Sequence, residues 1–254
     1  MRKLVIILTT VCLALLALPA AAEEMGAGAI GRVSVWGVRQ GMGKQFEQGL
    51  KKHNDFHKRH NDNWVFGTWQ ILSGENTGRY YRGTFDHQWS DFDAEEKLGP
   101  EDDADAAVNL DPYMEPGATS YYAKLKDMSR PWEGTGPSPM STLIWFEVKI
   151  DQEDEFMLLM HRVHEAILKT SWPVHYTWYR LVNGGEEPAF VLALPRKNFA
   201  DMAPPSMSFD AMLEQALGRE EARSVSSRLN STLRGTHSEL IRYRPDLSYE
   251  PAGK

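Results

Sequence analysis

The sequence has a single cysteine, Cys12, which lies in the apolar N-terminal segment Leu4–Leu18. Two basic residues precede this segment and Pro19–Ala22 follows it, which is the pattern of a secretory signal peptide cleaved after Ala22. We therefore expect residues 1–22 to be removed and the mature protein to be periplasmic or secreted. Without cysteine, the mature chain would have no disulfide, no thiolate nucleophile and no Cys-ligated metal site.

The sequence also has fewer basic residues than acidic ones. The chain has 28 Lys and Arg residues against 35 Asp and Glu, a net charge of −7, and cleavage after Ala22 would remove two basic residues and lower the charge to −9. Nucleic acids and anionic membrane surfaces attract basic proteins, so both classes of partner are excluded. No other segment approaches the about 20 apolar residues of a transmembrane helix. We expect no membrane association beyond export.

Recognisable catalytic motifs are absent as well. No nucleophile elbow groups a serine with a histidine and an aspartate. The acidic stretch Glu101–Asp111 lacks the ligand spacing of a calcium-binding loop. The sequence therefore indicates no standard hydrolase and no EF-hand.

What the sequence does contain is an internal repeat. "VSVWGVRQGMGKQFEQGLKKH" aligns with "TLIWFEVKIDQEDEFMLLMHRVH" at an offset of 110, which places Trp36 on Phe146 and Phe46 on Phe156. Further along, Thr68-Trp69 aligns with Thr177-Trp178 at an offset of 109. The order of elements is kept over roughly 100 residues, which predicts a duplicated unit.

Each unit is predicted to run strand, helix, strand, strand, helix, strand. Apolar alternation, helical periodicity and Gly-rich turns place these elements at 33–38, 44–60, 64–72, 79–85, 90–109 and 120–126, and at 143–148, 152–169, 174–182, 189–194, 208–233 and 239–244. A βαββαβ unit is the ferredoxin-like fold. Two such sheets should pack sheet-to-sheet, giving an α+β protein that is an intramolecular dimeric α/β barrel. We expect the units at 23–128 and 142–254, with the Pro- and Gly-rich linker 129–141 between them.

A resemblance supports this fold. "VFGTWQILSGENTGRYYRGTFDHQWSDFDA" resembles the hairpin-plus-helix segment of NIPSNAP-like proteins of the dimeric α/β-barrel superfamily over about 30 residues. The matching residues are Gly67, Trp69, Gly74, Asn76, Trp89 and Ser90. The second unit departs from the pattern, because Tyr176 stands where the first has Gly67.

The resemblance implies a choice of functions. The superfamily includes haem-dependent chlorite dismutase-like proteins and dye-decolourising peroxidases, and also cofactor-free monooxygenases. The Gly-x-x-Asp-Gly motif of the peroxidases is absent from this sequence. The cofactor therefore stays unassigned, with haem as one option for which the sequence has no motif.

Two histidines are candidate metal ligands. His53 and His57 continue the apolar stripe of their helix and align with Val163 and Ile167, so we expect both to face the sheet. Histidines four residues apart on a helix can ligate one metal ion, although the sequence identifies no third ligand. Hydrogen-bonded packing is the alternative interpretation. His60, near the helix end, should be solvated.

A second set of polar residues follows the strands. If their faces point between the sheets, they line a cavity where a carboxylate, an imidazole and a phenol could carry out acid–base chemistry. The alternative places them at strand ends in water. The candidates are Arg39, Glu147, His175, Tyr179, Thr68 and Gln70.

Two functional classes remain open at this point. The first is a protein that binds a small, partly apolar ligand between its sheets. The second is an oxidative enzyme, either a cofactor-free monooxygenase or haem-dependent. Histidine-based metal binding is a third option, and assembly as a homo-oligomer is compatible with each.

Overall fold

The computed structural model describes residues 30–95 and 98–251, so the predicted signal peptide lies outside the described residues. In that part of the chain no helix combines the length and the apolar character needed to cross a membrane.

The two halves have the same order of elements. The first half comprises β1 (Ile30–Val38), α1 (Gly43–Arg59), β2 (Gly67–Ser73), β3 (Tyr80–His87), α2 (Trp89–Glu95), α3 (Gly99–Asn109) and β4 (Met114–Arg130). The second comprises β5 (Met140–Val148), α4 (Glu153–Thr170), β6 (Tyr176–Asn183), β7 (Ala189–Arg196), α5 (Phe209–Leu217), α6 (Arg219–Thr232) and β8 (Leu233–Tyr243). Short 3-10 helices are η1 (Asp111–Tyr113), η2 (Ile150–Gln152), η3 (Phe199–Met202) and η4 (Pro245–Leu247).

The strands form a closed antiparallel barrel in the order β1-β3-β2-β8-β5-β7-β6-β4. Each half supplies four neighbouring strands in the same ferredoxin-like order, β4-β1-β3-β2 and β8-β5-β7-β6. The pairs β2–β8 and β4–β6 join the halves, so strands that would be open edges of an isolated sheet are hydrogen-bonded. The predicted α+β fold is confirmed, and the two sheets are continuous along both edges.

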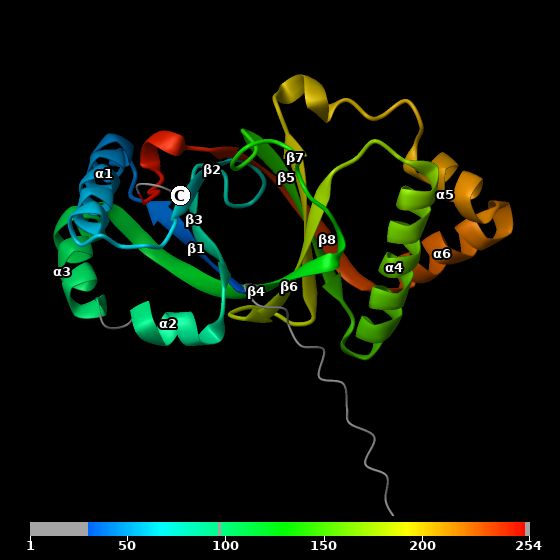
Figure 1. The fold of residues 1–254 in the computed structure, drawn as a ribbon, viewed down its shortest axis with the longest axis horizontal. Helices are drawn as coiled ribbons and strands as arrows, with labels where there is room; N and C mark the ends of the chain where they lie inside the picture. Colours follow the sequence, from blue (N-terminus) through cyan, green and yellow to red (C-terminus); the bar gives the residue numbers. More distant parts are fainter. Residues whose placement is uncertain (1–29, 96–97, 252–254) are drawn as a thin grey trace, which may run out of the picture.

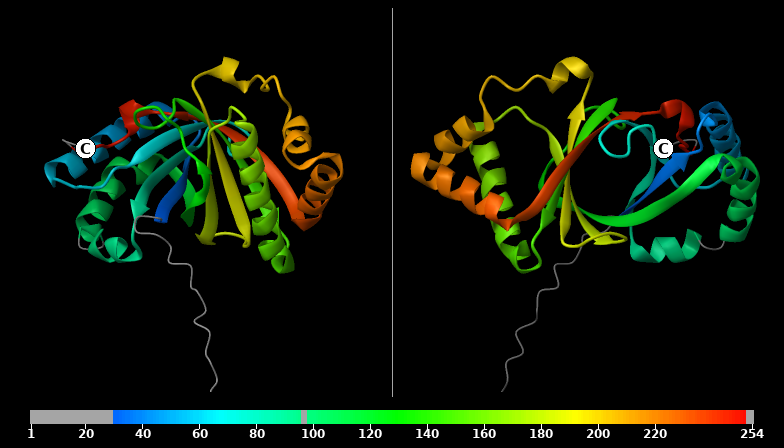
Figure 2. Two further views of the ribbon diagram at one scale, coloured as in Figure 1. Left: turned by 45° about the vertical axis from the view of Figure 1, so that its right-hand side comes forward. Right: turned by 180° about the vertical axis from the view of Figure 1, so that it is seen from behind.

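The helices lie outside the barrel. Figure 1 shows α1, α2 and α3 on one side and α4, α5 and α6 on the opposite side, and both views of Figure 2 show the same separation. Each four-stranded sheet therefore has one face toward the barrel interior and one face under its own helices.

The second half buries the larger apolar core. Helix α4 places Phe156, Met160, Val163 and Ile167 on one face at helical spacing, and all four are buried against the sheet and the neighbouring helices. Aromatic contacts between the helix and the sheet extend the cluster, with the ring centroids of Phe156 on α4 and Phe190 on β7 4.8 Å apart. This layer is an ordinary hydrophobic core.

The structure corrects the sequence alignment by one residue in the hairpins. Trp69 points into the barrel and contacts Tyr243, whereas Trp178 points outward and packs on Phe156. Thr68 therefore corresponds to Trp178 and Trp69 to Tyr179, at the same offset of 110 that holds elsewhere. Because side chains of a strand alternate between faces, the one-residue error reversed the predicted direction of the β2 side chains.

Candidate functional site

The barrel interior contains a cavity of about 430 Å³. Strands of both halves contribute to its walls, with Val33 from β1, Leu143 from β5 and Ile241 from β8 among its aliphatic residues. Aromatic rings dominate the lining: Trp69, Tyr81, Phe85, Tyr122, Trp132, Trp145 and Tyr179. A cavity of this size and character suits a small, flat molecule.

The connection between the halves also lines this cavity. Residues Pro131, Trp132 and Ser138 belong to the segment between β4 and β5 and lie in its wall. The Trp132 Nε1–H group is buried and has no hydrogen-bond acceptor among the described residues. A buried donor without an acceptor is unfavourable by roughly 1–3 kcal/mol, so an acceptor on a ligand could relieve that cost.

The phenols of the cavity are neutral at physiological pH. Burial raises the pKa of Tyr179 well above its ordinary value and also raises the pKa of Tyr122. Burial, reinforced by the hydrogen bond to Glu239, raises the pKa of Tyr81. Tyr81 donates its hydroxyl proton to Glu239 Oε2 at 2.6 Å, and Asn76 Nδ2 donates to Glu239 Oε1 at 2.8 Å. The buried carboxylate is therefore fully engaged.

An ion pair lies in the wall of this largely apolar cavity. Lys124 Nζ donates to Asp86 Oδ1 at 3.0 Å, and both residues belong to the lining. Their side chains are partly exposed, so the pair marks the solvent-accessible part of the cavity.

Of the six residues predicted to share a cavity, Tyr179 lies in the barrel lining. Arg39 is exposed beyond the end of β1, where its Nε donates to the Met114 carbonyl oxygen at 2.9 Å. Glu147 lies half-exposed with Oε1 3.5 Å from His237 Nδ1. The prediction that these residues converge is wrong. Arg39 lies past the end of β1, and the carboxylate of Glu147 lies beside His237.

The other three candidates face the helices or the second pocket. Thr68 is fully buried on the outer face of β2, where its hydroxyl donates to the Leu247 carbonyl oxygen at 3.0 Å. Gln70 pairs with Tyr80, whose side chain reaches α1, so Gln70 shares that outer face. His175 precedes β6, and its Nδ1 lies 2.9 Å from the Pro131 carbonyl oxygen.

A second pocket of about 750 Å³ lies between the outer face of the second sheet and its helices. Haem iron is held in proteins by a His, Cys, Met or Tyr side chain, so the lining of this pocket bears on the haem option. His164 and His175 line this pocket, and the Nδ1 atom of each lies within 2.9 Å of an oxygen, of Tyr176 and Pro131 respectively. Imidazole nitrogens are thus present in the wall of this pocket, and the Nε2 atom of His175 also lies 4.0 Å from Glu133 Oε1. Among residues 30–95 and 98–251, no histidine lines the barrel cavity.

The helix histidines lie where the periodicity predicts. His53 and His57 are 5% and 3% exposed beneath α1, and His53 Nδ1 lies 2.9 Å from Asp105 Oδ2. His57 Nδ1 lies at the same distance from Asp62 Oδ2. The sequence did not identify Asp102 of α3, whose Oδ1 atom lies 3.5 Å from His53 Nε2 and 3.6 Å from His57 Nε2.

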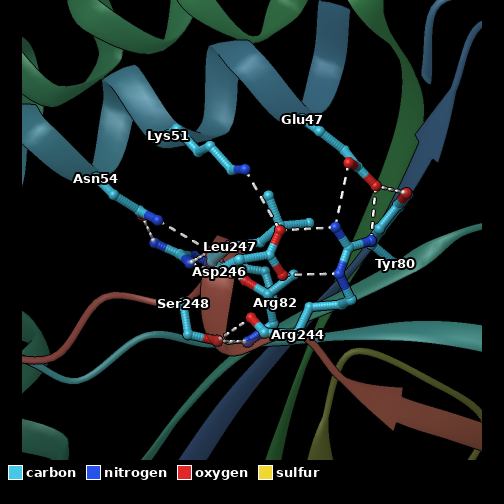
Figure 3. A network of polar contacts seen from close by, with 10 residues as sticks. Glu47, Lys51, Asn54, Tyr80, Arg82, Arg244, Asp246, Leu247 and Ser248 are labelled. Atoms are coloured by element: carbon cyan, nitrogen blue, oxygen red, sulfur yellow. Dashed lines mark hydrogen bonds and ion pairs between the residues drawn. The ribbon is translucent and has the colours of Figure 1, made fainter. Parts of the chain in front are cut away.

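Charged residues continue beneath α1 (Figure 3). Arg82 of β3 is buried and donates to Asn54 Oδ1 at 2.7 Å and to the Leu247 carbonyl oxygen at 3.0 Å. Burial lowers the pKa of Arg82 to about 9, so it remains charged at neutral pH. Beside it, Arg244 donates from Nη1 and Nη2 to the two carboxylate oxygens of Glu47.

Comparisons with known proteins agree on the fold. No protein-family model and no curated protein matches the sequence. Among solved structures, a chlorite dismutase variant from Candidatus Nitrospira defluvii aligns with a TM-score of 0.56 and 11% identity over 87% of this chain and 93% of that one. An anthrone oxidase-like protein aligns at 0.54 and 11% over 91% and 96%, and a proposed monooxygenase from Lactobacillus acidophilus at 0.53 and 7% over 88% and 97%.

The chain therefore has the dimeric α/β-barrel fold, built within one polypeptide. Identities this low establish a shared fold and leave activity to be argued from the sites. The narrower likeness to NIPSNAP-like proteins, and the duplication of the unit, stay predictions.

Proposed function

We propose that the barrel cavity binds a small, flat, partly apolar molecule that carries a hydrogen-bond acceptor. The observation behind the proposal is an aromatic cavity of about 430 Å³ whose lining includes Trp132, with an Nε1–H group that has no acceptor among the described residues. Small-molecule sites are typically apolar cavities of about 300–1,000 Å³ with a few placed polar groups. The neutral hydroxyl of Tyr179 and the Lys124–Asp86 pair are such groups.

Binding can be tested with the fluorescent probe 8-anilinonaphthalene-1-sulfonate, which has an aromatic body and oxygen acceptors. Ala193→Phe would fill part of the cavity and should weaken probe binding at least tenfold. Trp132→Phe keeps a ring and removes the donor, so it should weaken binding by up to about tenfold, the value of one hydrogen bond. Leu158→Phe, on an exposed position of α4, is the matched control and should bind as wild type does. Undiminished binding by a natively folded Ala193→Phe protein would refute the cavity as the site.

A second candidate function is oxidation of such a ligand. The fold shared with an anthrone oxidase-like protein and a proposed monooxygenase favours it. In the corresponding reaction, anthrone and O₂ give anthraquinone and water: the methylene carbon loses two hydrogens and gains one oxygen atom, and the other oxygen leaves as water. Oxygen uptake equal to anthraquinone formed would support this activity. Absence of turnover by a protein that binds anthrone would leave the binding function alone.

A haem-dependent form of this chemistry would use the second pocket. Haem, when bound, would supply redox-active iron, and His164 or His175 would be the residue that holds it in this pocket. Protein purified from its native host should then show a Soret band that His164→Ala or His175→Ala shifts. A colourless native protein would exclude haem and leave the cofactor-free route.

We further propose that the protein is exported and forms a homo-oligomer. N-terminal sequencing of the mature protein tests cleavage after Ala22, and light scattering tests the assembly state. A protein that starts at Met1 in the cell extract would contradict export.

A further inference from the structure

The histidine cluster under α1 lies outside the barrel, apart from the cavity of the proposed function. His53 and His57 occupy successive turns of α1, with ring centroids 4.7 Å apart. Asp102 approaches both from α3. The two Nε2 atoms and Asp102 Oδ1 all lie within 4.8 Å of one another.

A cation between the two rings and Asp102 would satisfy the lone pairs that face one another there. A neutral imidazole has one N–H group. In both rings the 2.9 Å contact to a carboxylate is made by Nδ1, so the N–H group belongs there. The Nε2 lone pairs then face Asp102 Oδ1, which is buried and accepts no hydrogen bond among the described residues.

The two separations that involve Asp102 match the spacing of ligands around a metal ion. Zinc–nitrogen and zinc–oxygen bonds of about 2.0–2.2 Å at tetrahedral angles place ligand atoms about 3.3–3.6 Å apart. The Asp102 Oδ1 atom lies 3.5 Å and 3.6 Å from the two Nε2 atoms. Both separations are longer than the 2.9 Å of the Nδ1 hydrogen bonds.

The surrounding groups resemble the outer shell of a metal site. Metal-ligating histidines usually donate their other N–H to a carboxylate, which orients the ring. Asp105 has this position for His53 and also accepts from Asn109 Nδ2 at 3.1 Å. Asp62 has it for His57 and also accepts from the Trp64 backbone N–H at 2.9 Å. Both carboxylates are thus held in place independently of the histidines.

The local charge also favours a divalent cation. Three carboxylates, those of Asp62, Asp102 and Asp105, surround two imidazoles. Buried Arg82 supplies one opposing charge from the sheet, and Arg59, with its side chain 62% exposed, lies 3.9 Å from Asp105. Arg32 also lines the adjoining hollow, so among the fully buried groups of the described residues Arg82 alone opposes the carboxylates.

We infer that His53, His57 and Asp102 bind one divalent transition-metal ion of the zinc class. A hollow of about 370 Å³, lined in part by all three residues and by Arg82 and Thr84, adjoins them. The hollow provides a route for the ion and space for a water molecule as a further ligand. The second half has no counterpart, because Val163 and Ile167 stand at the positions of the two histidines.

Zinc binding by full-length protein, stripped with a chelator and titrated with Zn²⁺, tests the site. Wild type should bind one Zn²⁺ per chain and unfold at a higher temperature with the ion than without it. Asp102→Asn keeps the shape and removes the ligand charge, so affinity should fall at least tenfold. Asp105→Asn should lose about 10–100-fold through ring orientation. His60→Gln, one turn further along α1, is the control and should bind as wild type does.

Imidazole nitrogen NMR provides a readout that does not depend on the variants folding. Added Zn²⁺ should shift the Nε2 resonances of His53 and His57 and leave that of His164 unchanged. No zinc uptake by folded wild type overturns the inference. Equal uptake by wild type and Asp102→Asn, or zinc-induced shifts confined to other histidines, overturns it as well. Probe binding in the barrel cavity is measured separately, so failure of one proposal is distinguishable from failure of the other.

Discussion

The layers beneath α1 and beneath α4 occupy equivalent places in the two halves and are built from opposite chemistry. At five buried or half-buried positions the first half has a polar residue where the second half, 110 residues later, has an apolar one. These pairs are His53 and Val163, His57 and Ile167, Thr68 and Trp178, Arg82 and Leu192, and Thr84 and Leu194. The second layer is stabilised by apolar burial and the first by hydrogen bonds and ion pairs. One backbone arrangement thus supports a hydrophobic core and a polar network.

The apolar residues beneath α4 are explained by their contribution to stability, but the polar residues beneath α1 require another explanation. Burying charged groups brings a desolvation cost that pairing roughly offsets, so a polar layer is seldom more stable than an apolar one of equal volume. A polar network at core positions is therefore a candidate for function. The α1 layer, rather than the α4 layer, is therefore the candidate for binding a metal ion directly.

The largest expected difference is between Arg82→Met and Leu192→Met. Removing the guanidinium leaves Asn54 Oδ1, Thr68 and backbone carbonyls without their donor, and should lower the free energy of unfolding by about 4 kcal/mol. Leu192→Met conserves volume and should cost about 1 kcal/mol or less. Urea unfolding of both variants measures the difference. Equal losses would mean that the two layers are energetically alike.

Placing a histidine in the apolar layer beneath α4 should lower the free energy of unfolding by less than Arg82→Met does. Ile167→His places an imidazole in the apolar core next to Val163 without a carboxylate partner, and should destabilise the protein by about 2 to 3 kcal/mol. The reverse change, His57→Ile in metal-free protein, should cost about 1 kcal/mol, because Asp62 retains its bond from the Trp64 N–H. Thermal unfolding of the pair checks the order, and a more damaging His57→Ile would contradict it.

Tyr80→Phe makes a smaller change toward the second half, where Phe190 is the equivalent residue. The Tyr80 hydroxyl donates to Glu47 Oε1 at 2.8 Å, and Glu47 keeps its bonds from Arg244. The loss should be about 1 kcal/mol, the value of one hydrogen bond. A loss above 3 kcal/mol in denaturant unfolding would indicate that the whole network depends on this hydroxyl.

Acid should weaken the first layer slightly. Hydrogen bonds from Arg244 lower the pKa of Glu47 below its usual 4.5 and the pKa of Asp246 to about 2. Groups whose pKa is lower in the folded state stabilise it at neutral pH, and this contribution is lost as the pH falls from about 4.5 toward about 2. The side chains are 29% and 45% exposed, so solvent screening should keep the loss below about 1 kcal/mol.

Unfolding midpoints at pH 7 and pH 3 measure this effect. Glu47→Gln removes one of the two titrating groups and should reduce the change between the two pH values. An unchanged pH dependence in that variant would assign the acid sensitivity to other carboxylates.

The fold could be predicted from the sequence because the patterns that define each element are local and occur in both halves. Helical spacing of Phe46 and Phe156 and the Gly-containing turns defined each unit, and Gly74, with φ of +98°, does form the β2–β3 turn. The candidate cavity was harder to predict. A one-residue shift in the hairpin alignment put Thr68 and Gln70 on the wrong face, and the alternating run Tyr81, Gly83, Phe85 was the signal that could have identified the interior.

Asp102 shows a different limit of sequence reasoning. It lies 45 residues after His57, at the start of α3, in an acidic stretch that has the composition of a solvated surface. Its approach to the histidines depends on how α3 packs against α1, which no spacing rule encodes. Trp132 is similar, because only the path of the connection brings its ring into the barrel wall.

The continuous barrel affects how the sequences of its two halves can diverge in evolution. A barrel assembled from two identical chains carries every substitution twice, so a ligand-binding residue appears on both sides or on neither. Joining the halves in one polypeptide removes that symmetry. One side can then keep the apolar packing that secures folding while the other accumulates charged groups, and the seams β2–β8 and β4–β6 hold the unequal partners at a fixed ratio of one to one.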